Sequence, residues 1–205
     1  MATYIIIIIL TCLVSITAFT NHKHIDQMVM WPALVKQKGQ YYRFITSGLI
    51  HADWMHLGFN MLTLYFFGGI VESAFNQLFG RGIFLLFYVL ALIVSDLPTY
   101  FKYQNNYMYR SLGASGAISG VIFASILISP ASKIGIFIIP IGIPAYIFGP
   151  LYLLYCMYMS KRGMDGINHS AHFWGALFGI LFTLVGSYTI AHFDLVGYFI
   201  QQVSA

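Results

Sequence analysis

The chain has 205 residues, of which 59% are hydrophobic and only 8% are charged, and its formal net charge is +4. An ordinary soluble domain is about 25% charged, so this composition excludes a soluble globular protein and predicts an integral membrane protein. The ten basic residues are too few and too scattered for a nucleic-acid surface. Cys12 and Cys156 lie inside apolar segments, so we expect packing residues there, with no disulfide framework and no zinc site.

Long apolar segments predict membrane-spanning helices. Backbone polar groups find no partner in lipid, so a spanning segment is either a helix or part of a closed barrel. The apolar segments here are continuous and do not alternate with polar residues, which favours helices. The expected fold is therefore an all-α membrane protein, a bundle of six transmembrane helices. We predict spans near residues 2–19, 55–70, 83–97, 111–129, 134–159 and 170–190.

A single domain at residues 1–205 accommodates these spans. Its predicted parts are a first helix at 2–19, an interfacial loop at 20–54, a catalytic core at 55–190 and a short tail at 191–205. The loop combines basic and aromatic side chains, as is typical of the membrane–water interface.

Polar residues and prolines set the expected ends of three spans. We expect the second span to close near Glu72 and the third to end at Asp96 and Pro98. The fifth span contains three prolines, so its first part is expected to be irregular or re-entrant, with the regular helix beginning near Pro144.

Residues 111–120 open the fourth span with small residues, including Gly113, Gly116 and Gly120. One interpretation is helix packing, because two glycines four residues apart form a face that membrane helices favour. The other is a nucleophile, because Ser115 begins the helix, where unpaired N–H groups can stabilise a developing negative charge. A lone Gly-x-Ser-Gly motif does not decide between them.

Polar side chains inside the other spans bear on that choice, because ionisable groups in lipid are costly and suggest function. His56 and Asn60 share a face of the second span, with His51 nearer the entrance. His172 borders a second stripe of small residues, which includes Gly175, on the sixth span. Two such stripes can pack backbone to backbone.

The parity of the spans brings these residues to one side of the bilayer. The second, fourth and sixth spans are parallel, so Ser115, His172, His56 and Asn60 are expected at one depth. A histidine can take a serine proton and return it to a leaving amine without an aspartate, if packing orients its ring. His56, Asn60 and the Ser115 amide can then stabilise an oxyanion.

Two other interpretations stay open for the histidines. A transmembrane histidine often serves only as a hydrogen-bond partner between helices. A zinc site built from His51, His56 and His172 is conceivable, although the chain has no His-Glu-x-x-His motif and no cysteine ligand beside them.

Three motifs in three spans resemble the rhomboid family of intramembrane serine proteases, bacterial type. They are His51-x4-His56-x3-Asn60, Gly113-Ala114-Ser115-Gly116 and Ala171-His172-x2-Gly175-x3-Gly179. Tyr42-Arg43 resembles the end of the family's first loop, a motif that often reads Trp-Arg. Gly68-Gly69-x2-Glu72 resembles the end of the family's second span. The resemblance covers about residues 41–180.

The resemblance implies a Ser115 nucleophile, a His172 base and an oxyanion hole of His56, Asn60 and the Ser115 amide. It also implies supporting roles for His51, Gly113, Gly116 and Gly175. The implied substrates are single-span membrane proteins cut in or near the transmembrane segment, with no cofactor, no metal and no nucleic acid. The oligomeric state stays open. A non-catalytic binder of membrane proteins and a small transporter are the alternatives.

Two arguments give opposite orientations for the protein in the membrane. Eight of the ten basic residues fall on the side of the long first loop, so the positive-inside rule places the mouth of the site in the cytoplasm. The resemblance implies the opposite, and we follow it: a bacterial cytoplasmic membrane, with the site open to the outer side.

Overall fold

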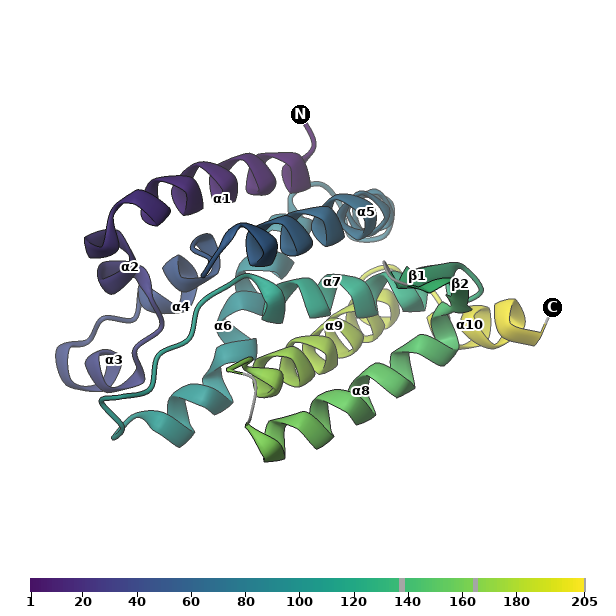
Figure 1. Ribbon diagram of the computed structural model, residues 1–205. Coiled ribbons are helices and arrows are strands. Elements are labelled where there is room, and N and C mark those ends of the chain that lie inside the picture. Colours follow the sequence, from purple (N-terminus) through teal and green to yellow (C-terminus); the bar gives the residue numbers. More distant parts are fainter. Residues whose placement is uncertain (137–138, 164–165, 205) are drawn as a thin grey trace.

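The computed structural model describes residues 1–136, 139–163 and 166–204, and six helices of 14 to 25 residues form a bundle in it (Figure 1). Of the described helices, three are long and apolar enough to cross a membrane. The protein is thus an all-α membrane protein, as predicted. The six helices are α1 (Thr3–Thr20), α5 (Trp54–Leu78), α6 (Ile83–Tyr103), α7 (Ser115–Ile128), α8 (Ala145–Arg162) and α9 (His169–Thr189).

Shorter elements lie at the two ends of this bundle (Figure 1). The long first loop contains α2 (His22–Met28), α3 (Pro32–Lys38), α4 (Arg43–Thr46) and the short 3-10 helix η1 (Ser47–Leu49). At the opposite end lie the antiparallel strands β1 (Lys133–Ile136) and β2 (Ile139–Pro144), together with α10 (Leu195–Ser204). The N-termini of α5, α7 and α9 all point toward the loop end, which agrees with the parity argument.

Glu72 does not end the second span, contrary to prediction, because α5 continues to Leu78. Its carboxylate accepts hydrogen bonds from the backbone N–H groups of Thr3 at 2.8 Å and Tyr4 at 2.9 Å. These are unpaired donors at the start of α1. These two hydrogen bonds stabilise the Glu72 carboxylate inside the bundle, so α5 can continue past this residue.

Asp96 and Pro98 do not end the third span either, because both lie inside α6. Proline costs one helical hydrogen bond, a loss that neighbouring helices can compensate in a membrane bundle. Asp96 has a partner outside the helix, since its carboxylate accepts a hydrogen bond from Asn168 at 3.4 Å.

The fifth predicted span begins irregularly, as expected. Its first part forms the hairpin of β1 and β2, in which Lys133 pairs with Pro144 and Gly135 with Gly142. The regular helix α8 begins at Ala145, directly after the proline that was expected to precede it. Residues 137–138 of this span, residues 164–165 of the next loop and residue 205 of the predicted tail lie outside the described residues.

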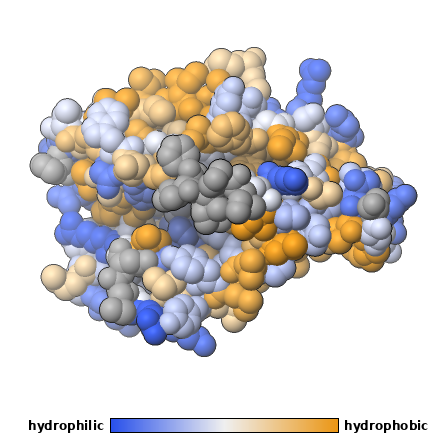
Figure 2. Space-filling view, turned by 45° about the vertical axis from the view of Figure 1, so that its right-hand side comes forward, coloured by the Kyte–Doolittle hydropathy of each residue, from blue (hydrophilic) through white to orange (hydrophobic). Residues whose placement is uncertain are grey.

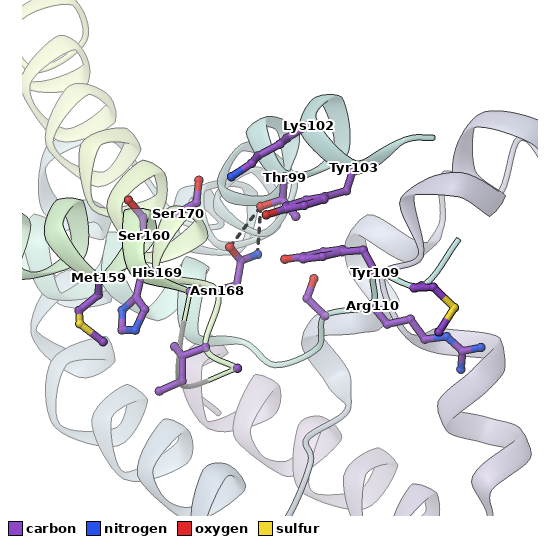
Figure 3. A pocket seen from close by; sticks show the side chains of 15 residues that line it. Thr99, Lys102, Tyr103, Tyr109, Arg110, Met159, Ser160, Asn168, His169 and Ser170 are labelled. Carbon is purple, nitrogen blue, oxygen red and sulfur yellow. Dashed lines mark hydrogen bonds between the residues drawn. The ribbon is translucent and has the colours of Figure 1, made fainter. Parts of the chain in front are cut away.

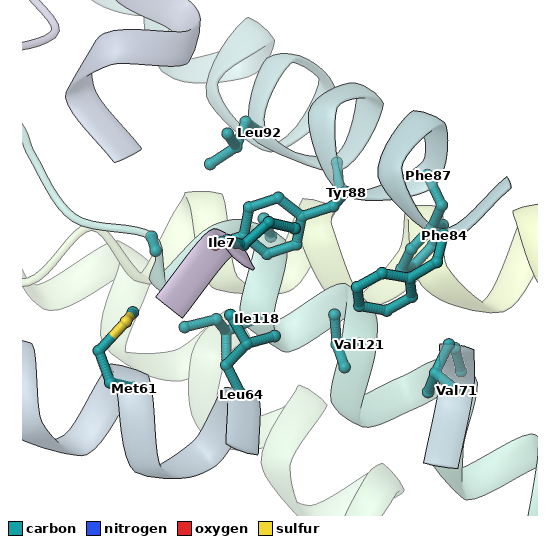
Figure 4. Close-up of a cluster of buried hydrophobic side chains, with 14 of the residues drawn as sticks. Ile7, Met61, Leu64, Val71, Phe84, Phe87, Tyr88, Leu92, Ile118 and Val121 are labelled. Atoms are coloured by element: carbon teal, nitrogen blue, oxygen red, sulfur yellow. The ribbon is translucent and has the colours of Figure 1, made fainter. Parts of the chain in front are cut away.

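The largest buried cluster joins α1, α5, α6 and α7 (Figure 4). Leu64 of α5 and Val121 of α7 are fully buried there, with Phe87 of α6. The ring of Phe87 meets Phe75 edge-on, with centroids 5.2 Å apart. Such contacts contribute dispersion energy, which drives helix association in lipid. The cluster fixes the helices around α7.

Helix α7 is the centre of the bundle. Ten of its fourteen residues are buried. The helix is about 21 Å long at 1.5 Å per residue, shorter than the roughly 30 Å of a hydrocarbon core. At least one of its ends therefore lies within the depth of the membrane.

Large apolar side chains are exposed on the outer helices. Leu13 of α1, Phe66 of α5, Leu86 of α6 and Leu154 of α8 each have about half or more of their surface exposed. Figure 2 shows such hydrophobic side chains over much of the face that it displays. This surface suits contact with lipid acyl chains.

Candidate active site

The backbones of α7 and α9 are in direct contact through two pairs of glycines. A β-carbon added at Gly175 would run into the carbonyl oxygen of Gly116, and one added at Gly179 into that of Gly120. A β-carbon at Gly120 would in turn lie 3.0 Å from the Gly175 carbonyl oxygen. The two small-residue stripes therefore pack backbone to backbone, as their spacing predicts.

This close packing brings Ser115 and His172 together. Ser115 is the first residue of α7, and His172 lies in the first turn of α9. The Nε2 atom of His172 lies 2.7 Å from the Oγ atom of Ser115. This distance is typical of a hydrogen bond made by a hydroxyl group.

A tight turn before Ser115 receives the two polar side chains of α5. Gly113 has a φ of +115°, and a β-carbon there would lie 2.7 Å from the ring of His56 and 3.9 Å from the amide nitrogen of Asn60. Asp53 caps α5 by accepting the His56 backbone N–H at 2.8 Å. Only glycine meets both the conformation and the space at this turn, so His56 and Asn60 lie against the backbone two residues before Ser115.

The start of α7 supplies backbone donors at the same place. The preceding residue, Ala114, makes no side-chain cap for the helix. The first N–H groups of an α-helix have no partner within the helix. The Ser115 N–H therefore has no acceptor within α7 and is available to an oxygen at the helix start.

His51 precedes α5 at the loop end of the bundle and is fully buried. Burial, together with the neighbouring His56, lowers the pKa of His51 to about 3, so its ring is neutral. The Ala114 N–H donates to its Nε2 at 3.5 Å, and its Nδ1 lies 3.0 Å from the hydroxyl of Ser15, which donates to the Leu49 carbonyl. The ring thus ties α1 to the turn before Ser115.

A family model described as Rhomboid domain matches residues 38–189. The chain belongs to the rhomboid family. Rhomboid-like protein 11, chloroplastic, of Arabidopsis thaliana is 29% identical over 155 residues, which are 69% of this chain and 51% of that protein. Rhomboid protease AarA of Providencia stuartii is 25% identical over 166 residues, 71% of this chain and 56% of that protein.

A third relative, rhomboid protease GlpG of Haemophilus influenzae, is 30% identical over 97 residues, 47% of this chain and 44% of that protein. The matched part of this rhomboid thus spans about half the length of each of the three relatives. The relatives include bacterial and organellar proteins, and two of the three are named as proteases.

Asn168 lies directly before α9, and no role was predicted for it from the sequence. Its side chain caps α9 by accepting the Ala171 N–H at 3.1 Å, and it also bonds to Asp96 of α6. Figure 3 shows its two further hydrogen bonds with Thr99 of α6. An asparagine directly before a helix is a recognised cap signal, so its capping role was open to prediction. The network holds the turn of α9 that carries His172.

A small cavity adjoins this network. It has a volume of about 20 Å³ and is lined by Ser95, Asp96, Ser115 and Asn168, among others. This space is enough for one water molecule, and the polar side chains around it offer hydrogen bonds. A polar compartment therefore lies next to the Ser115 side chain.

Arg43 anchors the long first loop of this rhomboid. Its buried guanidinium donates to the Val29 carbonyl at 2.7 Å and to the Asp26 carbonyl at 3.0 Å. The loop also pairs with the segment before α7, since Met30 and Ser111 exchange backbone hydrogen bonds. Hydrogen bonds therefore hold the loop against the segment that precedes Ser115.

Cys156 lies close to two other potential metal ligands. Cys156 is buried, as a packing residue would be, but it lies with His169 and His172 in a group whose potential metal-ligating atoms are within 4.8 Å of one another. Among the described residues, Cys156, His169 and His172 are the three potential ligands that lie close enough to hold one metal ion. His51, His56 and His172 do not make such a group. The face of α8 that meets α9 determines this, and it could not be read from spacing alone.

Proposed function

We propose that this rhomboid is a serine endopeptidase that cleaves single-span membrane proteins in or near their transmembrane segments. The observation that carries the proposal is the 2.7 Å separation of His172 Nε2 and Ser115 Oγ at the start of a buried helix. A nucleophile is recognised by a base within hydrogen-bond reach, and the base by packing that orients it. Both features are present here.

The first step is acylation. His172 Nε2 takes the proton from Ser115 Oγ as this oxygen attacks the carbonyl carbon of the scissile peptide bond. The negative charge that develops on the carbonyl oxygen is stabilised by the N–H of Ser115 and by the side chains of His56 and Asn60. His172 then gives its proton to the leaving amine, and an ester to Ser115 remains.

The second step is deacylation by water. His172 takes a proton from a water molecule, whose oxygen attacks the ester carbonyl, and returns that proton to Ser115 Oγ as the ester breaks. The small polar cavity beside Ser115 supports this step, because it has room for one water molecule and polar side chains that can bond to it.

The substrate must expose a carbonyl to be cut. In a transmembrane helix every backbone group is bonded within the helix, so the segment has to unwind locally before Ser115 reaches it. Helix-breaking residues near the cut lower the cost of unwinding. We propose substrates of this kind, in the bacterial cytoplasmic membrane, approached from its outer side.

The experiment is cleavage of a model single-span substrate by the purified full chain in detergent, together with a fluorophosphonate probe that labels activated serines. We expect one cut and labelling that disappears in Ser115→Ala. Substrate binding without cleavage or labelling would instead indicate the non-catalytic binder. Cleavage by Ser115→Ala would overturn the assignment of the nucleophile.

A further inference from the structure

Three potential metal ligands from α8 and α9 lie close together, and one of them, His172, belongs to the candidate dyad. Cys156 is fully buried, His169 is 3% exposed, and both lie next to His172. One ligand atom from each residue lies within 4.8 Å of the other two. The proposed proteolysis uses only His172, so Cys156 and His169 have no part in it.

Neighbouring contacts hold the three side chains in place. The ring of Tyr155 meets His169 edge-on, with centroids 5.4 Å apart, and His169 meets His172 in the same way at 5.7 Å. One turn before Cys156, the hydroxyl of Tyr152 lies 3.0 Å from that of Ser119 on α7. The packing of α8 on α7 and α9 therefore preforms the group.

The donor set has a chemical preference. One thiolate and two imidazoles suit Zn²⁺ and other thiophilic divalent ions, whereas Mg²⁺ and Ca²⁺ prefer oxygen ligands. Zn–S bonds are about 2.3 Å long and Zn–N bonds about 2.0–2.1 Å, so ligand atoms around a tetrahedral Zn²⁺ are about 3.3–3.6 Å apart. Side-chain shifts of about 1 Å would bring the three atoms to that spacing, which leaves a fourth position for water or Ser115.

We propose that Cys156, His169 and His172 form an inhibitory binding site for a thiophilic divalent cation such as Zn²⁺. On binding, Cys156 releases its thiol proton to solvent and forms a metal–sulfur bond, while each histidine donates a ring-nitrogen lone pair. No redox change is involved. The inhibitory part rests on the proposed function, but the binding part does not.

Inhibition follows from the use of His172. A metal on Nε2 would replace the hydrogen bond to Ser115 Oγ. A metal on Nδ1 would take the lone pair of that nitrogen, so the single N–H of the neutral ring would lie on Nε2, which could then donate to Ser115 Oγ but could not accept its proton. In both cases the base is lost for as long as the ion stays bound.

An ion can reach the group from the loop end of the bundle. A cavity of about 380 Å³ lies there, and Thr99, Asn168, His169 and Ser170 are among the residues that line it (Figure 3). His169 belongs to both the cavity wall and the ligand group. It is therefore the first ligand that an entering hydrated ion would meet.

The binding test uses Co²⁺ and the purified full chain carrying Ser115→Ala, so that its result does not depend on proteolysis. We expect the charge-transfer absorption of a cobalt–thiolate bond and the visible bands of tetrahedral cobalt. The matched control is Cys12→Ser in the same background, because Cys12 belongs to no such ligand group among the described residues. The bands should persist in Cys12→Ser and disappear in Cys156→Ser.

The inhibition test compares cleavage with Zn²⁺ and after chelation, with every variant normalised to its own chelated rate. We expect the half-inhibitory Zn²⁺ concentration to rise at least about tenfold in Cys156→Ser and in His169→Gln, since even outer-shell changes cost 10–100-fold in metal affinity. The His169→Gln variant decides the question if Cys156→Ser does not fold.

Two results would overturn the proposal. One is cobalt spectra that lack the thiolate band or keep it in Cys156→Ser. The other is Zn²⁺ inhibition that is equal in wild type, Cys156→Ser and His169→Gln. A chain that binds cobalt through Cys156 but never cleaves a substrate would refute the proteolysis and leave the metal site standing.

Discussion

The carbonyl oxygen of Gly116 occupies the space that a β-carbon on Gly175 would need. This contact sets how closely α7 and α9 approach, and Ser115 and His172 lie within one turn of it. The 2.7 Å contact between their side chains therefore depends on two residues that carry no side chain.

We expect Gly175→Ala to lower the thermal stability of the protein and to abolish cleavage. The added methyl group meets backbone, which cannot rotate away, and overpacking of this kind costs about 1–3 kcal/mol or more. The control is Gly58→Ala on α5, where a β-carbon would meet nothing within 4 Å. Equal melting temperatures for the two variants in detergent would contradict the backbone contact.

Ser115→Ala and His172→Ala should each reduce cleavage to the uncatalysed background, and the double variant should be no worse. Residues that share one proton act as a unit, so their losses are not additive. Rate measurements on the three purified variants check this. If the two losses multiplied, Ser115 and His172 would be acting independently.

His56→Ala and Asn60→Ala should lower kcat and leave KM nearly unchanged. Each removes a donor to the developing oxyanion, and loss of one such donor costs on the order of 10²–10³ in rate. Steady-state kinetics on a single-span substrate separates the two constants. An increase in KM at unchanged kcat would make these side chains substrate-binding or structural.

His51 should make the protein less stable in mild acid. Its pKa falls from the ordinary 6.5 to about 3, so between these values the unfolded chain takes up a proton that the folded chain does not. The contribution of neutral His51 to the free energy of unfolding is therefore fully present above about pH 6.5 and is lost as the pH decreases toward 3.

Melting temperatures measured across this range check the His51 prediction. His51→Gln should flatten the dependence, whereas His24→Gln, at an exposed position, should not. The same slope in wild type and His51→Gln would show that other groups cause the acid sensitivity.

Orientation is tested by cysteine labelling in a background that lacks Cys12 and Cys156. Lys38→Cys, exposed on α3 at the loop end, should react with a membrane-impermeant thiol reagent in intact cells. Lys133→Cys, exposed on β1 at the opposite end, should react only after permeabilisation. The reverse pattern would place the mouth of the site in the cytoplasm, as the distribution of basic residues suggests.

The sequence alone determined the class of fold and the grouping of the candidate site. Backbone groups in lipid must pair within a helix or a closed barrel, and the continuous apolar segments of this chain lack the alternating pattern of barrel strands, so they form helices. The number of crossings then sets direction, which places Ser115, His172, His56 and Asn60 on one side without any coordinates. The glycine stripes indicated which helices touch, because small residues mark close approach.

Only the tertiary structure decided contacts between residues whose pairing no local pattern records. Glu72 and Asp96 look like helix ends until their partners, the N–H groups at the start of α1 and the Asn168 side chain, are known. The burial of His51 and the meeting of Cys156 with His169 and His172 depend on the rotation and crossing of whole helices. Sequence periodicity gives the face of a helix, but the angle at which two faces meet is set by packing across the entire bundle.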